Sequence, residues 1–176
     1  MTALDILRAY ESSQRTSPDE YASSTPLPIN EGDRVGVVLF NLGGPAALDE
    51  VEPFLYRLLM DPALLGLPVG GRLRHWMAKS IAYVRGTSLR EQYEMIGGGS
   101  PVPRLAQEQA QVLRRHLQAQ YGDPAGVDFY TYPAMRYGRP FPEEAAAHMA
   151  ADGVDKVVLL PSYPQYSTAT TGPALT

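Results

Sequence analysis

Three polar segments of this chain combine tyrosine, arginine or serine with glycine or proline, as ligand-binding loops do. They are Tyr93 to Pro101, which contains three consecutive glycines, Ala134 to Pro140, and Tyr163 to Ser167. A guanidinium suits a carboxylate, because its planar fork donates two parallel hydrogen bonds. A tyrosine ring packs against a flat ring system and offers its hydroxyl to polar groups. These segments are the candidate binding parts of the chain.

The glycine turn at residues 97–99 leads into a predicted helix, and helix N-termini with exposed amides favour anions. Its context does not fit a nucleotide. A dinucleotide fingerprint needs a strand before its glycines, and a phosphate loop needs Gly-Lys-Ser/Thr, and the chain has neither here. The alternative interpretation is a structural turn followed by a helix cap.

Composition restricts the chemistry that this chain can do. Its 176 residues are enough for one compact domain. The absence of cysteine excludes disulfides, thiolate metal sites and thiol nucleophiles. A net charge of −4 with both signs mixed gives no footprint for a nucleic acid. No leader-like or membrane-spanning run is present, so we expect a cytoplasmic protein.

The order of predicted elements indicates an α/β fold. Residues 1–34 read as a flexible N-terminal extension, because they are poor in apolar side chains. After them we expect strands at Val35–Phe40, Asp128–Tyr132 and Lys156–Leu160, and helices at Asp49–Met60, Leu89–Ile96, Ser100–Tyr121 and Phe141–Ala151. This alternation predicts a Rossmann-like parallel sheet flanked by helices.

Ligands of such a sheet bind beyond the carboxyl ends of its strands. Residues 41–45, 134–140 and 162–167 each follow a predicted strand directly. We therefore expect these three segments to lie at one edge of the sheet, where they can share a ligand.

The order and spacing of three motifs resemble ferrochelatase, the enzyme that inserts ferrous iron into a porphyrin to make haem. They are Tyr93 to Pro101, Asn41 to Pro45, and Tyr163 to Ser167. The resemblance covers residues 35–176 and implies the family's first, chelatase-type domain. It also implies a helical lip at about residues 50–90 over the mouth of the pocket. The stretch from Ala63 to Val84 belongs to this lip.

The resemblance also implies which residues bind porphyrin. An arginine contacts a propionate, a tyrosine and a serine around the glycines line the pocket, and an arginine–tyrosine pair forms its inner wall. The implied porphyrin-binding residues are Leu42, Arg85, Tyr93, Ser100, Arg136, Tyr137 and Tyr166. Leu42 stands where some members carry a tyrosine that approaches the metal, and leucine cannot ligate. If Arg136 is buried, it must be paired, because an unpaired buried charge is costly.

Ferrous iron and porphyrin are substrates in this interpretation, and no cofactor is required. Chelation needs a base for two pyrrole protons and a path for iron. In the family a histidine motif and a glutamate of the second half supply these, and neither motif occurs in this sequence. We therefore expect an N-terminal part without the second catalytic domain, and no catalytic or metal-binding residue in this chain. His75, His116 and His148 read as surface residues.

Three alternatives remain open. The chain can be a half-subunit that pairs with a separate second half, or a porphyrin- or haem-binding module without chemistry. A flavodoxin-like anion-binding domain is the third, and the missing phosphate fingerprints argue against it.

The apolar lip can contact a membrane surface, or it can be a partly packed helical hairpin. Leu42 and Gln165-Tyr166-Ser167 favour protoporphyrin over coproporphyrin.

Overall fold

The computed structural model describes residues 27–62, 64 and 70–163 of the chain. Three parallel strands form one sheet in the order β2-β1-β3. The strands are β1 (Arg34–Asn41), β2 (Asp128–Met135) and β3 (Lys156–Pro161). The longer helices are α3 (Val51–Met60), α4 (Gly71–Met95), α5 (Val102–Leu117) and α7 (Pro142–Ala151), and the short turns are η1 (Leu48–Glu50), η2 (Gln118–Gly122) and α6 (Asp123–Ala125). The predicted parallel α/β sheet is confirmed.

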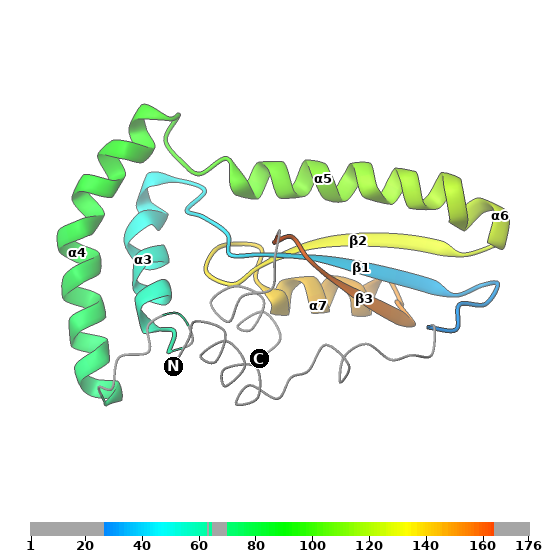
Figure 1. Ribbon diagram of the computed structural model, residues 1–176, viewed down its shortest axis with the longest axis horizontal. Coiled ribbons are helices and arrows are strands. Elements are labelled where there is room, and N and C mark those ends of the chain that lie inside the picture. Colours follow the sequence, from blue (N-terminus) through cyan, green and yellow to red (C-terminus); the bar gives the residue numbers. More distant parts are fainter. Residues whose placement is uncertain (1–26, 63, 65–69, 164–176) are drawn as a thin grey trace, which may run out of the picture.

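Strand β1 forms the centre of the core, because its side chains are buried on both faces of the sheet. Val35, Val37 and Leu39 pack with Ala110 of α5. The alternate side chains of β1 pack with Ala145 of α7 in a second cluster. A central parallel strand covered on both faces reads as a continuous apolar run, which is why its position was predictable from sequence. Figure 1 shows α5 and α7 on opposite sides of the strands.

Helices α3 and α4 form an antiparallel hairpin beyond the carboxyl ends of β1 and β2 (Figure 1). The face of α4 that packs on α3 is made of small residues, Ala78, Ala82 and Gly86, together with Arg74. The hairpin coincides with most of the stretch predicted as a lip at about residues 50–90. Its position places a wall of helices next to the edge where the sheet is expected to bind a ligand.

Helix α4 differs from the sequence-based prediction, which placed a helix only at Leu89–Ile96. The helix is continuous from Gly71 to Met95. Its large apolar side chains point to solvent and its small ones face α3, so the usual apolar stripe toward a core is reversed. The predicted start of this helix at Leu89 was therefore wrong, because the stretch before it has no clean apolar period.

The strand boundaries differ less from their predicted positions than the start of α4 does. Strand β2 continues to Met135, three residues past the predicted end at Tyr132. Pro133 lies inside it, opposite Leu39 of β1. Proline is tolerated there because β2 is an edge strand of the described sheet, and its missing N–H costs no ladder bond on the outer side. Strand β1 begins at Arg34, the last residue assigned to the predicted extension, most of which lies outside the described residues.

Candidate functional site

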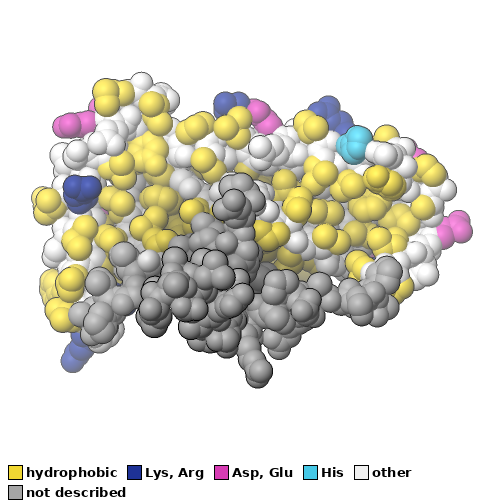
Figure 2. All heavy atoms as spheres, in the orientation of Figure 1, with side chains coloured by type: hydrophobic (Ala, Val, Ile, Leu, Met, Phe, Trp, Pro, Cys, Tyr) yellow, Lys and Arg dark blue, Asp and Glu magenta, His cyan; other side chains and the backbone are white. Residues whose placement is uncertain are grey.

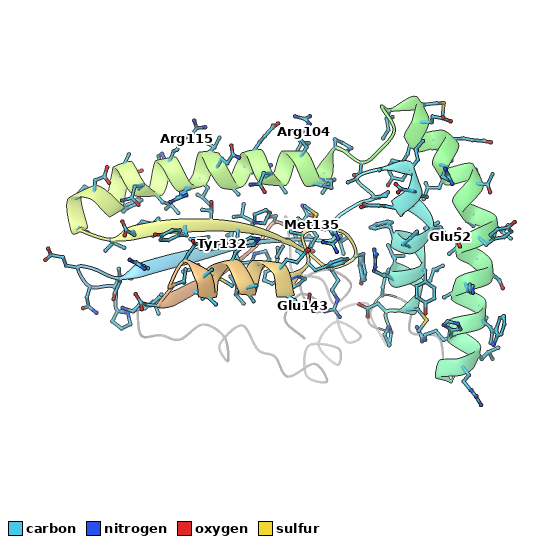
Figure 3. All side chains as sticks on the ribbon, turned by 180° about the vertical axis from the view of Figure 1, so that it is seen from behind. Glu52, Arg104, Arg115, Tyr132, Met135 and Glu143 are labelled. Atoms are coloured by element: carbon cyan, nitrogen blue, oxygen red, sulfur yellow. The ribbon has the colours of Figure 1, made fainter. Side chains whose placement is uncertain are left out.

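The loops after β1 and β2 are joined by two backbone hydrogen bonds. The amide of Arg136 donates to the carbonyl of Asn41 at 3.0 Å, and the amide of Tyr137 donates to the carbonyl of Leu42 at 3.0 Å. Three predicted site residues, Leu42, Arg136 and Tyr137, are therefore neighbours at the carboxyl end of the sheet. Figure 3 labels Met135, the last residue of β2, at the end of the sheet that faces the hairpin.

A tight turn after β1 makes room for these contacts. Gly43 has φ +87°, a left-handed conformation that side chains disfavour. A Cβ atom on Gly43 would lie 2.9 Å from Cβ of Met135 and 3.2 Å from the backbone nitrogen of Gly138. The Gly-Gly-Pro sequence after β1 thus lets the two strand-end loops approach each other closely.

The glycine turn between α4 and α5 is fastened to the same edge. The amide of Ser100 donates to the carbonyl of Pro45 at 2.7 Å, and the Ser100 hydroxyl accepts from the amide of Val102 at 3.3 Å. A Cβ on Gly44 would lie 2.4 Å from the Ser100 hydroxyl oxygen. Ser100 therefore accepts from the first residue of α5 and packs against the loop that follows β1, while the N-cap is Pro101, one residue after the predicted cap.

A buried carboxylate, Asp61, joins the hairpin to the loop after β2. Nε of Arg136 donates to Oδ2 of Asp61 at 3.2 Å, and the hydroxyl of Tyr137 donates to the same oxygen at 2.9 Å. The side chain of Asp61 is 7% exposed and that of Arg136 is 32% exposed. Arg136 is therefore paired, as its partly buried position requires, and it is not a free strand-end arginine in solvent.

The state of the Tyr137 hydroxyl follows from this pairing. Burial, and then the hydrogen bond and charge of Asp61, raise the pKa of Tyr137 to about 12. At neutral pH the phenol is protonated and acts as a hydrogen-bond donor, so it cannot serve as a base. Its role in the site is to donate and to pack.

Three further contacts hold helix α3 against the same loop independently of Asp61. Nη1 of Arg57 donates to the carbonyl of Tyr137 at 2.8 Å, and its guanidinium lies over the ring of Phe141, 5.0 Å from the centroid. The ring of Phe54 meets that of Tyr137 edge to face, with centroids 6.5 Å apart. The hairpin and the sheet edge are thus fixed relative to each other around Tyr137.

An open hollow of about 440 Å³ lies between the end of α3 and the loop after β2. It is lined by the residues just described and their neighbours on α3: Tyr56, Arg57, Met60, Asp61, Pro62, Arg136 and Tyr137. These lining residues carry two guanidinium groups, one carboxylate and two phenols. Such a surface suits an acceptor-bearing ligand with an extended flat body.

The hydroxyl of Tyr163, just after β3, adds a further polar atom. It is buried and has no hydrogen-bond partner within the described part of the chain. Burial raises the pKa of Tyr163, while the positive charge of Arg136 acts in the opposite sense. The porphyrin-binding residues implied by the sequence did not include Tyr163. A buried donor without a partner next to an arginine is instead a candidate ligand contact.

The remaining predicted residues are less closely grouped. Tyr93 is half-buried in the last turns of α4, and burial raises its pKa. Arg85 lies on the exposed side of α4, where the structure gives it no hydrogen bond or ion pair to the described residues. Tyr166 lies outside the described residues. The structure therefore brings together four of the seven predicted residues, Leu42, Ser100, Arg136 and Tyr137, around the strand ends.

Sequence reasoning missed Asp61, Arg57 and Tyr56 as parts of the site. Asp61-Pro62 was interpreted only as the end of a helix. No local sequence signal identifies Asp61 as part of the site, because Arg136 and Tyr137 are 75 and 76 residues away from it in sequence. Within the described ranges, no three histidine or acidic side chains gather as metal ligands. The helices of these ranges also include none long and apolar enough to cross a membrane.

The raised pKa of Tyr137 predicts a specific pH dependence of stability. The group titrates near 10 when unfolded and near 12 when folded. Its stabilising effect is therefore complete below pH 10 and is lost as pH rises toward 12. We expect Tyr137→Phe to lower the free energy of unfolding by about 1 kcal/mol at pH 7. Urea unfolding at pH 7 and pH 11 should show this difference shrinking at the higher pH. A difference that stays constant would contradict the hydrogen bond to Asp61.

These features define an α/β domain with a polar, partly buried binding surface between the carboxyl ends of a parallel sheet and a helical hairpin. The family model of ferrochelatase matches residues 34–176. The chain therefore belongs to the ferrochelatase family.

Curated relatives with the name ferrochelatase match the same part. The protein of Cyanothece sp. strain PCC 7425 is 43% identical over 143 residues, and that of Prochlorococcus marinus strain NATL1A is 46% identical over 139 residues. The protein of Parasynechococcus marenigrum strain WH8102 is 47% identical over 139 residues. Each match covers 79% of this chain and 34% of the relative. The chain thus spans about a third of the length of these relatives.

Proposed function

We propose that this chain supplies one wall of the porphyrin pocket of a ferrochelatase, which inserts ferrous iron into protoporphyrin IX in haem biosynthesis. The observation that carries the proposal is the cluster of Arg136, Asp61 and Tyr137 beside a hollow at the carboxyl ends of β1 and β2. The family membership and the position of the hairpin over that edge support the same conclusion.

The residues have distinct roles in this proposal. Arg136 and Tyr163 offer donors to polar groups of the macrocycle, and Leu42 contributes an apolar surface. Ser100 and Tyr93 line the pocket from the glycine turn and the end of α4, and Arg85 binds a propionate at the mouth. The resemblance also assigns Tyr166 to porphyrin binding, and this residue lies outside the described residues.

The chemistry of metal insertion needs more than this wall. A base must remove two pyrrole protons, and the tyrosines of the cluster are held protonated at neutral pH. In our proposal these residues bind and orient the porphyrin, while the proton acceptor and the path for iron come from a second part of the enzyme. The partner of this surface is therefore that second part, with porphyrin and ferrous iron as substrates.

A metal-insertion assay with the purified chain tests the proposal. Zinc replaces iron so that fluorescence reports the product, and the Soret band of protoporphyrin reports binding. We expect binding without metal insertion above the uncatalysed rate. Absence of porphyrin binding would reject the proposed pocket. Insertion well above the uncatalysed rate would overturn the view that the base lies elsewhere. A comparison of protoporphyrin with coproporphyrin, for which we expect weaker binding, tests the substrate preference.

A porphyrin- or haem-binding module without chemistry is the second candidate. It shares the pocket. The observation in its favour is that Tyr137 and Tyr163 have raised pKa values, so neither can accept a pyrrole proton at neutral pH. It differs in the response to a second domain. Added second-domain polypeptide from a relative would restore zinc insertion if the chain is part of an enzyme, and would leave it absent if the chain only binds.

We also propose that the hairpin contacts a membrane surface. Its solvent side carries Leu73, Trp76, Ile81 and Val84 at helical spacing, with 55%, 67%, 40% and 70% of each residue exposed. Hydrophobic side chains are visible at the hairpin end of the face seen in Figure 2, as they are at the opposite end. A row of this kind can insert into the headgroup region of a bilayer.

Trp76 is the single tryptophan of the chain, so its emission reports the hairpin directly. We expect phosphatidylcholine vesicles to shift this emission to shorter wavelength, because burial in lipid removes water from the indole. Val84→Asp should weaken vesicle binding at least tenfold. The matched control is Val112→Asp on α5, where the valine is also exposed and the charge should have no effect. An unchanged spectrum with vesicles would contradict the contact.

A further inference from the structure

The carboxylate of Asp61 is shared by two donors that come from one loop. Arg136 and Tyr137 are adjacent in sequence, and both donate to Oδ2 of Asp61. Asp61 itself ends helix α3, on the other side of the hollow. One buried oxygen therefore links the helical wall of the pocket to the strand-end wall.

The orientation of the Arg136 guanidinium follows from which of its nitrogens donates to Asp61. Among the described contacts, Arg136 donates to Asp61 through Nε. A guanidinium is planar and rigid, so the bond from Nε fixes both Nη atoms: one lies on the carboxylate side and the other points away from it. Arg136 lines the hollow, and the Nη that points away from Asp61 is the part available to a ligand acceptor such as a carboxylate.

We propose that Asp61 is a positioning residue of the pocket, which holds the guanidinium of Arg136 so that the Nη pointing away from Asp61 meets a carboxylate of the bound ligand. This inference rests on the proposed porphyrin-binding function. Asp61 touches no ligand in this account and acts through Arg136. The partial exposure of Arg136, at 32%, keeps its free end accessible, while Asp61 at 7% is not.

The structure indicates that loss of this carboxylate will not detach the hairpin. Arg57 still donates to the Tyr137 carbonyl, and Phe54 still packs on the Tyr137 ring. Asp61→Asn keeps the shape of the side chain, removes its charge and replaces one acceptor oxygen with an amide NH2 donor. The variant therefore tests orientation rather than folding.

The experiment compares the protoporphyrin affinity of four proteins by Soret titration: wild type, Asp61→Asn, Arg136→Gln and the double variant. We expect Asp61→Asn to weaken binding about tenfold. On the Arg136→Gln background the same change should alter affinity less than twofold, because a residue that acts through Arg136 has no effect once Arg136 is gone. Glu108→Gln, which neutralises a carboxylate in an exposed helical ion pair, should bind as wild type does.

A spectroscopic measurement that needs no porphyrin accompanies the titration. Tyrosinate absorbance gives the pKa of Tyr137 as the difference between each protein and its Tyr137→Phe partner. Since Asp61 helps to raise that pKa, Asp61→Asn should lower it, whereas Glu108→Gln should not. An unchanged tyrosine titration would overturn the proposed network.

The possible outcomes separate this inference from the function on which it rests. If wild type binds no porphyrin, the proposed function fails and the positioning role falls with it. If wild type binds and Asp61→Asn binds equally well, only the positioning role is overturned. Additive effects in the double variant also overturn it. Should Asp61→Asn not fold, Arg136→Lys replaces it, since lysine keeps the charge without the fork; wild-type affinity in that variant would contradict the role of orientation.

Discussion

Replacing Gly99 by alanine is expected to destabilise the protein by about 3 kcal/mol, because the added methyl group has no space. A Cβ on Gly99 would lie 2.2 Å from the carbonyl oxygen of Ala46 and 2.7 Å from its carbonyl carbon. Both atoms are backbone, so no side chain can turn aside to relieve the contact. The loop after β1 and the glycine turn would have to separate, and Ser100 would leave its place beside Pro45.

Urea unfolding of Gly99→Ala against wild type measures this cost. The matched control is Gly70→Ala, the N-cap of α4, where no described atom beyond its chain neighbours lies within 4 Å of the added Cβ. That substitution should lower the free energy of unfolding by less than about 1 kcal/mol, because alanine is a poorer N-cap than glycine but meets no such contact. A small effect at Gly99 would mean that the glycine turn does not pack on the sheet edge as described.

Replacing Arg136 by leucine is the second change with a large expected effect. It leaves the carboxylate of Asp61 buried without its guanidinium partner, which costs about 2 kcal/mol after allowance for the partial exposure of Arg136. The loss should also weaken protoporphyrin binding at least tenfold, because a charge-assisted hydrogen bond to the ligand disappears.

A second substitution separates the buried charge from other consequences of losing Arg136. In Arg136→Leu with Asp61→Asn, a neutral amide replaces the buried carboxylate that has lost the Arg136 guanidinium, so more than half of the lost stability should return. Binding should remain weak, because the donor to the ligand is still absent. If the double variant is less stable than Arg136→Leu, the buried charge is not the source of the cost.

The sheet was predictable because its signals are local and agree with one another. Strand β1 is a run of apolar residues followed by Gly-Gly-Pro, and such a run is typical of a strand buried on both faces of a sheet. The end of β2 and the start of α4 could not be predicted from the sequence, for physical reasons. Pro133 suggests a strand end but lies at an edge, where proline is tolerated. Helix α4 packs through Ala78, Ala82 and Gly86, which carry almost no hydrophobic signal.

The candidate site was predicted in part for the same kind of reason. Arg136 and Tyr137 follow a strand directly, so their position at the sheet edge could be inferred from sequence. Their partner Asp61 is 75 residues from Arg136 in sequence and belongs to another wall of the hollow. No periodicity or local spacing connects two such residues. Only the tertiary arrangement shows that the carboxylate at the end of α3 and the arginine after β2 form one unit.

Trp76 offers the most direct test that a porphyrin binds between the hairpin and the strand ends. It is the single tryptophan and lies on α4, so a porphyrin in this pocket should quench its emission by energy transfer. Titration with protoporphyrin IX should give saturable quenching, shifted at least tenfold to higher concentration in Arg136→Gln and unchanged in Glu108→Gln. Absence of quenching, or equal quenching in all three proteins, would contradict the account.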